Sequence, residues 1–345
     1  MKRYLYLSIS IIFFFWGFCL AQGYDFLVRE AEGKMTEGNY EKALALFEKA
    51  LKTGEYHYND YLNMARIYVH MERSDTAFIY LNKAVKTGFV DQVELEEDPT
   101  LATLKGHSKW NVILKEMKKQ MEVIQSTFPD KHKEDVVIDL PQPNLKGTVS
   151  VEEAVYNRRS IRQYAKEPLN LEEISQLLWA AFGITKPLEN APAFLRGGLR
   201  AAPSAGARYP LDLYVVVRNV TGLDVGVYYY KSETHQLVQI SKKDKWQALS
   251  ESAFHQSHFE TAAAAIVYSA VFERCMMKYG QRGRERYVCM DLGHSGQNVY
   301  LQATAMNIGT CAIGAFTDIY LKKAVGMTKE EEPLYIMPLG KVEKE

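Results

Sequence analysis

The stretch Leu211-Asp212-Leu213-Tyr214-Val215-Val216-Val217 is strongly β-forming and apolar almost throughout, a pattern typical of a strand buried on both faces. Working outward, further strand-like runs occur at residues 227–230, 266–268 and 335–339. Helical patterns occur between and before them, at residues 151–157, 170–182 and 284–306. Strands interleaved with helices predict a layered α/β or α+β fold for residues 150–345.

The overall composition excludes several classes of protein. The chain has 345 residues with 42 Lys+Arg against 42 Asp+Glu, so its formal net charge is zero. A nucleic-acid-binding protein needs a basic surface, and we therefore predict no nucleic-acid partner. Aromatic residues make up 12% of the chain and prolines number only 11, which excludes a disordered protein.

The first 21 residues resemble an export signal. Lys2 and Arg3 precede an apolar run from Tyr4 to Leu20, and small residues follow it. We expect cleavage after Ala21 and an exported, periplasmic or extracellular protein; an uncleaved membrane anchor is the alternative. Of the four cysteines, Cys19 lies in the signal and the other three show no metal-ligand or disulfide spacing, so we predict no metal site.

Residues 22–127 contain an internal repeat. Shifting residues 24–54 by 34 positions aligns them with residues 58–88, and the shared residues include Ala43/Ala77, Ala50/Ala84 and Gly54/Gly88. A 34-residue helix-turn-helix period resembles tetratricopeptide repeats. Such repeats either bind a protein partner or only brace the fold, and the pattern leaves both open. The tyrosines of this region are expected between the helices: Tyr56, Tyr58, Tyr61 and Tyr68. Residues 128–149, with three prolines among charges, are predicted to be a linker.

Two motifs of the second half suggest a bound anion and a flat ligand. Arg158, Arg159 and Arg162 surround Ser160 at the end of a predicted helix, and clustered guanidinium groups suit a phosphate. A solvated basic turn is the alternative. The loop Pro203-Ser204-Ala205-Gly206-Ala207-Arg208 comes just before a strand, and its small residues allow a ligand to approach the backbone.

These motifs belong to an ordered series. After them come Gly293-His294, Gln297-Asn298, Gly314-Ala315-Phe316 and Pro333-Leu334-Tyr335. Together they resemble the flavin-dependent nitroreductase family, in particular its SagB/ThcOx-type dehydrogenase branch, over about residues 139–341. The resemblance implies an α+β sandwich that forms a homodimer with FMN at the subunit interface. The predicted fold is therefore an α+β, nitroreductase-like domain that follows a small all-α, tetratricopeptide-like domain.

The resemblance also implies roles for individual residues. Arg158, Arg159, Ser160 and Arg162 would hold the FMN phosphate and ribityl chain; Pro203, Ser204, Ala205, Gly206 and Arg208 would border the flavin; Gly314 and Ala315 would lie over its ring; and Lys341 would add a phosphate contact. Gln297 and Asn298 are expected in helix–helix hydrogen bonds, and His294 is expected to be buried. The family usually has Glu where Asp291 stands, which leaves that side chain's hydrogen bonds open.

Lys278 and Tyr279 are the candidate catalytic residues. A Lys-Tyr pair at this place in azoline-oxidising members is implied to remove a proton while a hydride passes to FMN, although such a dipeptide is also common on basic helices. We therefore expect an exported FMN-dependent oxidoreductase that acts on a small-molecule or peptide substrate. The alternative is a repeat-based interaction scaffold whose flavin-fold domain is inert.

Overall fold

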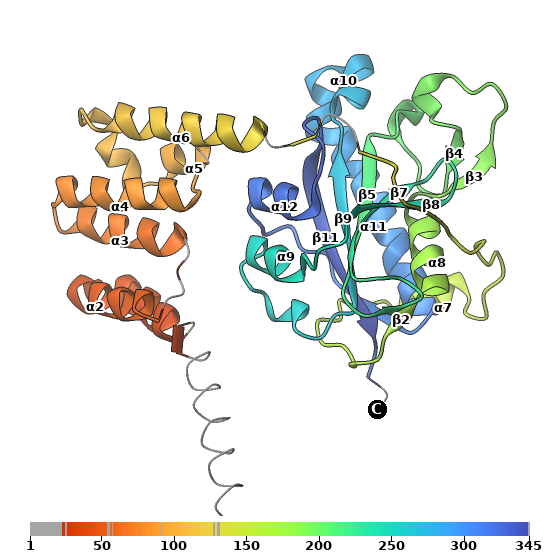
Figure 1. The fold of residues 1–345 in the computed structure, drawn as a ribbon, viewed down its shortest axis with the longest axis horizontal. Helices are drawn as coiled ribbons and strands as arrows, with labels where there is room; N and C mark the ends of the chain where they lie inside the picture. The colour runs from red at the N-terminus through yellow and green to blue at the C-terminus, as the bar shows by residue number, and fades with distance from the viewer. Residues whose placement is uncertain are drawn as a thin grey trace, which may run out of the picture. The chain divides into compact units, whose positions relative to one another are not determined.

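The computed structural model describes residues 23–24, 26–53, 56, 58–90, 92–126, 128–129 and 132–343. The predicted signal at residues 1–21 lies outside these residues. The chain divides into two compact units, Met1–Thr127 and Phe128–Glu345 (Figure 1). No helix among the described residues is both long and apolar enough to cross a membrane.

The first unit is helical throughout its described residues. Residues 26–36 are helical and are followed by α2 (Tyr40–Leu51), α3 (Tyr58–His70), α4 (Ser74–Thr87), α5 (Gln92–Glu97), η1 (Leu101–Gly106) and α6 (Trp110–Ser126). The alanines shared by the two repeats, Ala43, Ala50, Ala77 and Ala84, are fully buried. Small side chains at these points let neighbouring helices approach closely. Gly88 ends α4 in the left-handed conformation, with φ of 114°, which glycine adopts without strain.

The four tyrosines of this unit differ in burial. Tyr58 and Tyr68 are buried between helices, as the repeat pattern predicts. Tyr61 is half-buried, and Tyr56 is 60% exposed, so the prediction is wrong for Tyr56. The physical reason is its position, since Tyr56 precedes the first residue of α3 and therefore lies outside the packed helical face.

The second unit is built on a seven-stranded antiparallel sheet with the strand order β1-β8-β7-β5-β9-β11-β10. The strands, in chain order, are β1 (Val137–Asp139), β5 (Leu211–Val217), β7 (Gly226–Lys231), β8 (Gln236–Ser241), β9 (Ala264–Ala270), β10 (Ile308–Thr310) and β11 (Glu332–Lys341). All seven residues of β5 are buried, which confirms the strand predicted from the sequence. Two-stranded sheets are formed by β2 (Leu169–Asn170) with β6 (Val220–Thr221) and by β3 (Ile184–Pro187) with β4 (Gly198–Arg200).

Helices cover both faces of the large sheet (Figure 1). Leu211, Leu213 and Val215 of β5 pack into the cluster that also holds buried residues of α8 (Leu171–Phe182) and α11 (Val288–Ala305). Tyr214 and Val216, which point to the opposite face, pack with residues of α9 (Trp246–Ser252) and α12 (Asp318–Val325). This double covering explains why β5 is apolar throughout rather than alternating.

Two parts of the second unit differ from the expected pattern. The stretch predicted to be a linker, residues 128–149, contributes β1 to the sheet, where Val137 to Asp139 pair with β8. The helix expected over residues 284–306 begins with the π-helical turn Gly283–Tyr287 and continues as α11. Helix α10 (Glu273–Tyr279) lies directly before that turn. π-Helical turns occur often at functional sites.

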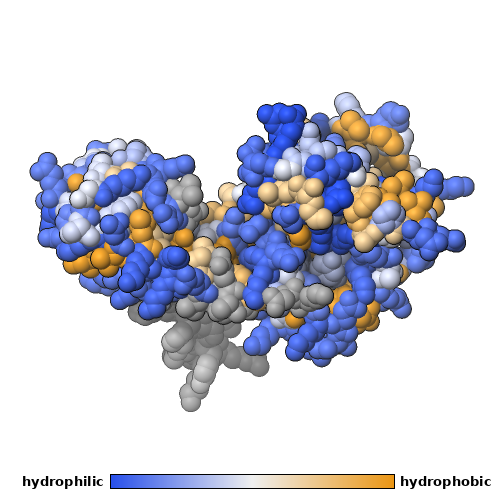
Figure 2. Space-filling model, turned by 90° about the horizontal axis from the view of Figure 1, so that it is seen from above, coloured by the Kyte–Doolittle hydropathy of each residue, from blue (hydrophilic) through white to orange (hydrophobic). Residues whose placement is uncertain are grey.

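Apolar side chains also reach the surface of this unit. In Figure 2 the hydrophobic residues form separate patches among hydrophilic ones. On α7 (Val151–Asn157) three large apolar side chains are exposed: Val151 at 69%, Val155 at 55% and Tyr156 at 78%. A short helix that keeps so much apolar area in water is available for packing against another surface.

Candidate functional site

The basic turn follows α7, whose start is fixed by a capping box between Ser150 and Glu153. After the helix ends, the backbone N–H of Ile161 donates to the carbonyl of Thr310 at 2.9 Å, which ties the turn to β10. Ser160 and Arg162 are exposed on this turn, and Arg158 is half-buried. The local fold therefore presents the predicted phosphate-binding residues to solvent.

Tyr300 of α11 connects this turn to the segment after β10. Its hydroxyl lies 3.1 Å from Ser160 Oγ and accepts a hydrogen bond from the backbone N–H of Ala312 at 2.7 Å. The guanidinium of Arg158 lies 5.4 Å from the centre of the Tyr300 ring. Ala312 leads directly into Gly314 and Ala315. The structure thus brings two predicted cofactor residues, Arg158 and Ser160, to one tyrosine that sequence reasoning missed, and the same tyrosine holds the segment that precedes Gly314 and Ala315.

The charges of the turn suit an anion. Arg158, Arg159 and Arg162 have no carboxylate partner within the part of the chain that the structure describes, and Arg159 donates only to the carbonyls of Tyr156 and Arg158. Like charges in such a cluster repel one another unless an anion joins them, and guanidinium groups bind phosphate with two parallel hydrogen bonds. The donor set therefore fits the FMN phosphate. Lys341 differs, because it forms an ion pair with Glu173.

The second predicted element, the loop Pro203–Gly206, is held by Asp291. This buried carboxylate accepts hydrogen bonds from Ser204 Oγ at 2.5 Å and from the backbone N–H of Ala205 at 3.2 Å. Burial raises the pKa of Asp291, and the two hydrogen bonds oppose that rise. The aspartate, where the family usually has glutamate, therefore still reaches the loop and fixes its backbone.

Lys278 and Tyr279 lie against the end of this loop. Gly206 has φ of +59°, and a Cβ at Gly206 would lie 2.7 Å from Lys278 Nζ and would collide with the Tyr279 hydroxyl. The Tyr279 ring also packs edge-on against Tyr287, with the ring centres 4.8 Å apart, and Arg282 Nε donates to the Tyr287 hydroxyl at 2.8 Å. The π-helical turn supplies Tyr287. The two candidate catalytic side chains and the predicted flavin loop therefore form one cluster.

Arg208 lies apart from both groups. Its Nε donates to the carbonyl of Arg274 at 2.7 Å, and its guanidinium lies 5.0 Å from the centre of the Phe194 ring. The side chain lines a cavity with Phe194 and Met277. Arg208 is thus near the loop in sequence, while its side chain faces a separate cavity.

The two groups of predicted residues lie on opposite sides of α11. Asp291 holds the loop group, and Tyr300 holds the basic-turn group. Their separation of nine positions corresponds to about 2.5 helical turns, or roughly 14 Å along the axis, and places them on opposite sides of the helix. A flat ligand cannot lie along opposite sides of one helix.

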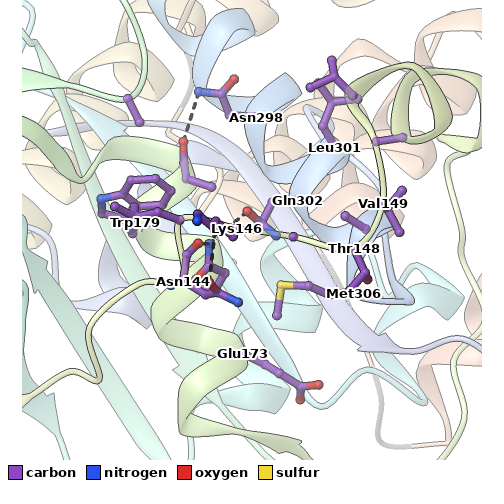
Figure 3. Close-up of a pocket in the computed structure, with 18 of the residues that line it drawn as sticks. Asn144, Lys146, Thr148, Val149, Glu173, Trp179, Asn298, Leu301, Gln302 and Met306 are labelled. Carbon is purple, nitrogen blue, oxygen red and sulfur yellow. Dashed lines mark hydrogen bonds between the residues drawn. The ribbon is translucent and has the colours of Figure 1, made fainter.

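Another cavity, of about 630 Å³, is lined by none of the predicted cofactor or catalytic residues (Figure 3). It lies between α8, α11 and the segment from Asn144 to Val151. The Gln176 side chain accepts a hydrogen bond from the Asn144 N–H at 2.7 Å and donates to Gln302 at 3.1 Å. Trp179 and Met306 supply apolar walls. The sequence did not predict this cavity, because its lining residues come from four separate segments of the chain.

Two expectations for α11 have different outcomes. Asn298 donates to the carbonyl of Ala180 at 3.0 Å, a helix–helix hydrogen bond within the chain, between α11 and α8; the expected bonds of Gln297 and Asn298 in a dimer core stay a prediction. His294 is exposed, so the prediction that it is buried is wrong. Its position on the helix explains this, because His294 shares the outer face with Met290 and Gln297, which are exposed as well.

Comparison with known proteins agrees with the fold described above. The model of the nitroreductase family matches residues 155–341, more than half of the chain. A Methanocaldococcus jannaschii protein that is named as a nitroreductase is 39% identical over 204 residues, which cover 59% of this chain and 96% of that protein.

Two further similarities are weaker. The microcin B17-processing protein McbC of Escherichia coli is 26% identical over 51% of this chain and 64% of its own length. This similarity agrees with the resemblance to the SagB/ThcOx-type branch. A solved structure from Ralstonia eutropha, named as a nitroreductase, is 23% identical with a TM-score of 0.49, over 63% of this chain and 95% of that chain. The family match and its coverage settle the assignment: the chain belongs to the nitroreductase family.

Proposed function

We propose that this protein is an exported FMN-dependent oxidoreductase that transfers a hydride between an organic or peptide substrate and the flavin. The observation that carries the proposal is the contact of Lys278 and Tyr279 with Gly206, at the end of the loop expected to border the flavin. A lysine amine and a tyrosine hydroxyl are groups that exchange protons with a substrate. Their meeting at this loop supports a reaction in which proton and hydride leave the same substrate.

The residues of the chain have separate tasks in this proposal. Arg158, Ser160 and Arg162 bind the phosphate, and Tyr300 orients Ser160. The backbone around Gly314 would border the flavin ring, where an amide can tune hydride acceptance. When bound, FMN accepts or gives a hydride at N5.

The proposed proton path starts at the C-terminal end of α10, where Lys278 and Tyr279 lie. Lys278 takes the substrate proton, and Tyr279 passes it toward solvent, while Tyr287 and Arg282 hold the Tyr279 ring in place. Asp291 keeps the loop close to these side chains. The proposed site takes this loop group from one chain and the basic turn from its partner in a homodimer, an arrangement common in the nitroreductase fold.

The kind of substrate follows from the proposed location. Reduced nicotinamide is scarce outside the cytoplasm, so dehydrogenation of an organic or peptide substrate suits an exported enzyme better than consumption of NAD(P)H. The similar McbC is named as a processing protein of a peptide, microcin B17, which is compatible with a peptide substrate. The helical first unit would then bind a protein partner or brace the enzyme.

The cofactor proposal is tested by reconstitution. The mature chain is purified, mixed with FMN and desalted, and its visible spectrum is recorded. We expect stoichiometric flavin absorbance in the wild type and its loss when Arg158→Ala and Ser160→Ala are combined. Arg286→Ala is the matched control, because Arg286 is an exposed arginine outside the basic segment 158–162. A wild-type protein that retains no flavin would contradict the proposed enzymatic function and favour the alternative of an interaction scaffold.

A further inference from the structure

A second cavity, of about 320 Å³, is lined in part by Glu273, Arg274 and Met277 of α10, the helix that also carries Lys278 and Tyr279. Its apolar walls include Phe194, Val271 and Met277, and it also contains three arginines: Arg196, Arg208 and Arg274. Apolar walls with a few charged groups are typical of small-molecule sites. We call this cavity the Arg208 pocket.

Two of the three arginines are already neutralised. Arg196 and Arg274 each donate to the buried carboxylate of Asp212 at 2.7 Å, and Arg196 also pairs with Glu233 at 2.8 Å. Burial alone would raise the pKa of Asp212, but the two arginines outweigh it and lower the pKa below its usual value. The positive charges of Arg196 and Arg274 are therefore paired within the protein, where they connect the walls of the pocket.

Arg208 is the third arginine of the pocket, and its charge is available to a ligand. Its Nε donates to a backbone carbonyl, its plane lies over Phe194, and no carboxylate pairs with it among the residues that the structure describes. Stacking on an aromatic ring fixes the orientation of a guanidinium while its terminal nitrogens stay available. A fixed guanidinium of this kind binds a carboxylate with two parallel hydrogen bonds.

The pocket adjoins the catalytic cluster at two points of the chain. Met277 in its wall immediately precedes Lys278, and Arg208 follows Gly206 by two residues. Lys278 and Tyr279 do not line the pocket themselves, but a molecule anchored in it and long enough to pass the end of α10 would reach them. Such an anchor would orient the bond that loses its proton.

Two carboxylates at the pocket restrict the kind of anion. Glu273 and Glu330 line it, both are exposed, and neither has an ion-pair partner in the described part of the chain. They repel a doubly charged phosphate more strongly than a single carboxylate, and they attract an ammonium group. The charge pattern thus favours a molecule with one carboxylate.

We propose that the Arg208 pocket is a substrate subsite that binds the carboxylate of an amino acid or peptide end through Arg208, with an apolar side chain between Phe194 and Met277. This inference rests on the proposed function only for the subsite's role in the reaction. The binding itself is a property of the pocket and is measurable whether or not the protein holds flavin.

The test compares three probes by calorimetry on the full mature protein. N-acetylphenylalanine carries the carboxylate, N-acetylphenylalaninamide lacks its charge, and phenyl phosphate carries a second negative charge. We expect the carboxylate to bind about tenfold or more tightly than the other two, since a charge-assisted pair exceeds a neutral hydrogen bond by more than about 1.4 kcal/mol. Equal binding of the acid and the amide would overturn the proposal.

Variants show which residue binds the carboxylate of the ligand. Arg208→Gln should abolish the preference for the acid over the amide, while Arg286→Gln, the same change at an exposed arginine, should keep it. Met277→Glu offers a second approach, because it places a negative charge in the wall and leaves Arg208 intact; it should weaken the acid more than the amide. A preference that survives both pocket variants would refute the subsite.

Flavin content separates this proposal from the proposed function. Each variant is reconstituted with FMN alongside the calorimetry. If Arg208→Gln keeps its flavin and loses the preference, Arg208 is a substrate residue. If it loses its flavin, Arg208 is a cofactor residue and the subsite is refuted. A wild type that binds no flavin yet prefers the acid would leave the subsite standing and overturn only the enzyme function.

Discussion

The carboxylate of Asp291 accepts a 2.5 Å hydrogen bond from Ser204 Oγ, so the long helix α11 fixes the loop on which Lys278 and Tyr279 rest. The same serine oxygen accepts from the Tyr209 N–H at 2.9 Å. A loop of small residues has little side-chain packing of its own. Its geometry therefore depends on these few polar contacts.

Replacing either member of this pair should loosen the loop. We expect Ser204→Ala and Asp291→Ala each to lower the free energy of unfolding by about 1–3 kcal/mol, because each leaves a buried polar group without its partner. Both single variants remove the same hydrogen bond. The double variant should therefore be less destabilised than the sum of the two single variants, with a coupling free energy of about 0.5–3 kcal/mol. Urea unfolding of the four proteins checks this. Fully additive effects would mean that the pair does not act as a unit.

Gly206→Ala should displace the candidate catalytic pair. A methyl group there would meet the Tyr279 hydroxyl and Lys278 Nζ, and the φ of +59° is unfavourable for alanine. We expect at least about a tenfold loss of substrate oxidation, with flavin content unchanged. Gly33→Ala is the control, because a Cβ at Gly33 meets no atom within 4 Å. Unchanged turnover in Gly206→Ala would argue against Lys278 and Tyr279.

Tyr300→Phe should weaken FMN binding without unfolding the protein. The variant loses the hydroxyl that contacts Ser160 Oγ and accepts from the Ala312 N–H. Two hydrogen bonds contribute about 1–3 kcal/mol, which corresponds to a Kd for FMN that is about 5- to 150-fold higher. Fluorescence titration measures it. Tyr156→Phe, at a tyrosine that is 78% exposed, should bind FMN like the wild type.

Much of this site was predictable because its motifs are local in sequence. Residues 158–162 and 203–208 each form one turn, and their composition alone indicated anion binding and close backbone approach. The strand at Leu211–Val217 was predictable because burial on both faces makes it apolar throughout. Single short segments of this kind carry their own signal.

What the sequence did not show depends on distant contacts. Tyr300 contacts Ser160, 140 residues away in the chain, and Ala312; the motif residues Gln297 and Asn298 lie close to Tyr300 in sequence but do not indicate this contact. Strand β8 was missed because the glutamines Gln236 and Gln239 interrupt its apolar pattern, while pairing with β1 and β7 on its two sides stabilises it. Val137–Asp139 form a strand only because β8 provides an edge for them.

Acid should destabilise the second unit through His235. Its ring lies 2.8 Å from Ser175 Oγ, 2.8 Å from the Tyr230 hydroxyl and 3.0 Å from the Pro141 carbonyl, and burial lowers its pKa. The unfolded chain therefore binds the proton more readily than the folded one. Stability contributed by the neutral ring is complete above the unfolded pKa, about 6.5, and is lost as the pH falls toward the lowered pKa of the folded state.

Thermal unfolding between pH 7.5 and 5 checks this behaviour. We expect the melting temperature of the wild type to fall with pH, and His235→Gln to have a shallower slope from a lower starting value. The slope should not vanish, because burial also lowers the pKa of His132 and His258. Parallel slopes in the two proteins would contradict a role for His235.

Mixed dimers test whether one flavin site takes residues from two chains. The basic-turn variant combines Arg158→Ala with Ser160→Ala, and the loop variant carries Gly206→Trp, whose indole would fill the space beside Lys278 and Tyr279. Each homodimer should hold no FMN. In a heterodimer both mutations fall in one site and the other site is wholly wild type. Co-expression with random pairing should therefore restore FMN to about a quarter of all sites.

The opposite arrangement predicts a different number. If each site were built within one chain, every site in the mixture would carry a mutation and no flavin would return. Differently tagged chains allow heterodimers to be purified, and these should hold about one FMN per dimer. Both variants must keep the dimer mass and the unfolding transition of the wild type. Because Asp291 and Tyr300 lie on opposite sides of α11, we expect the restored flavin.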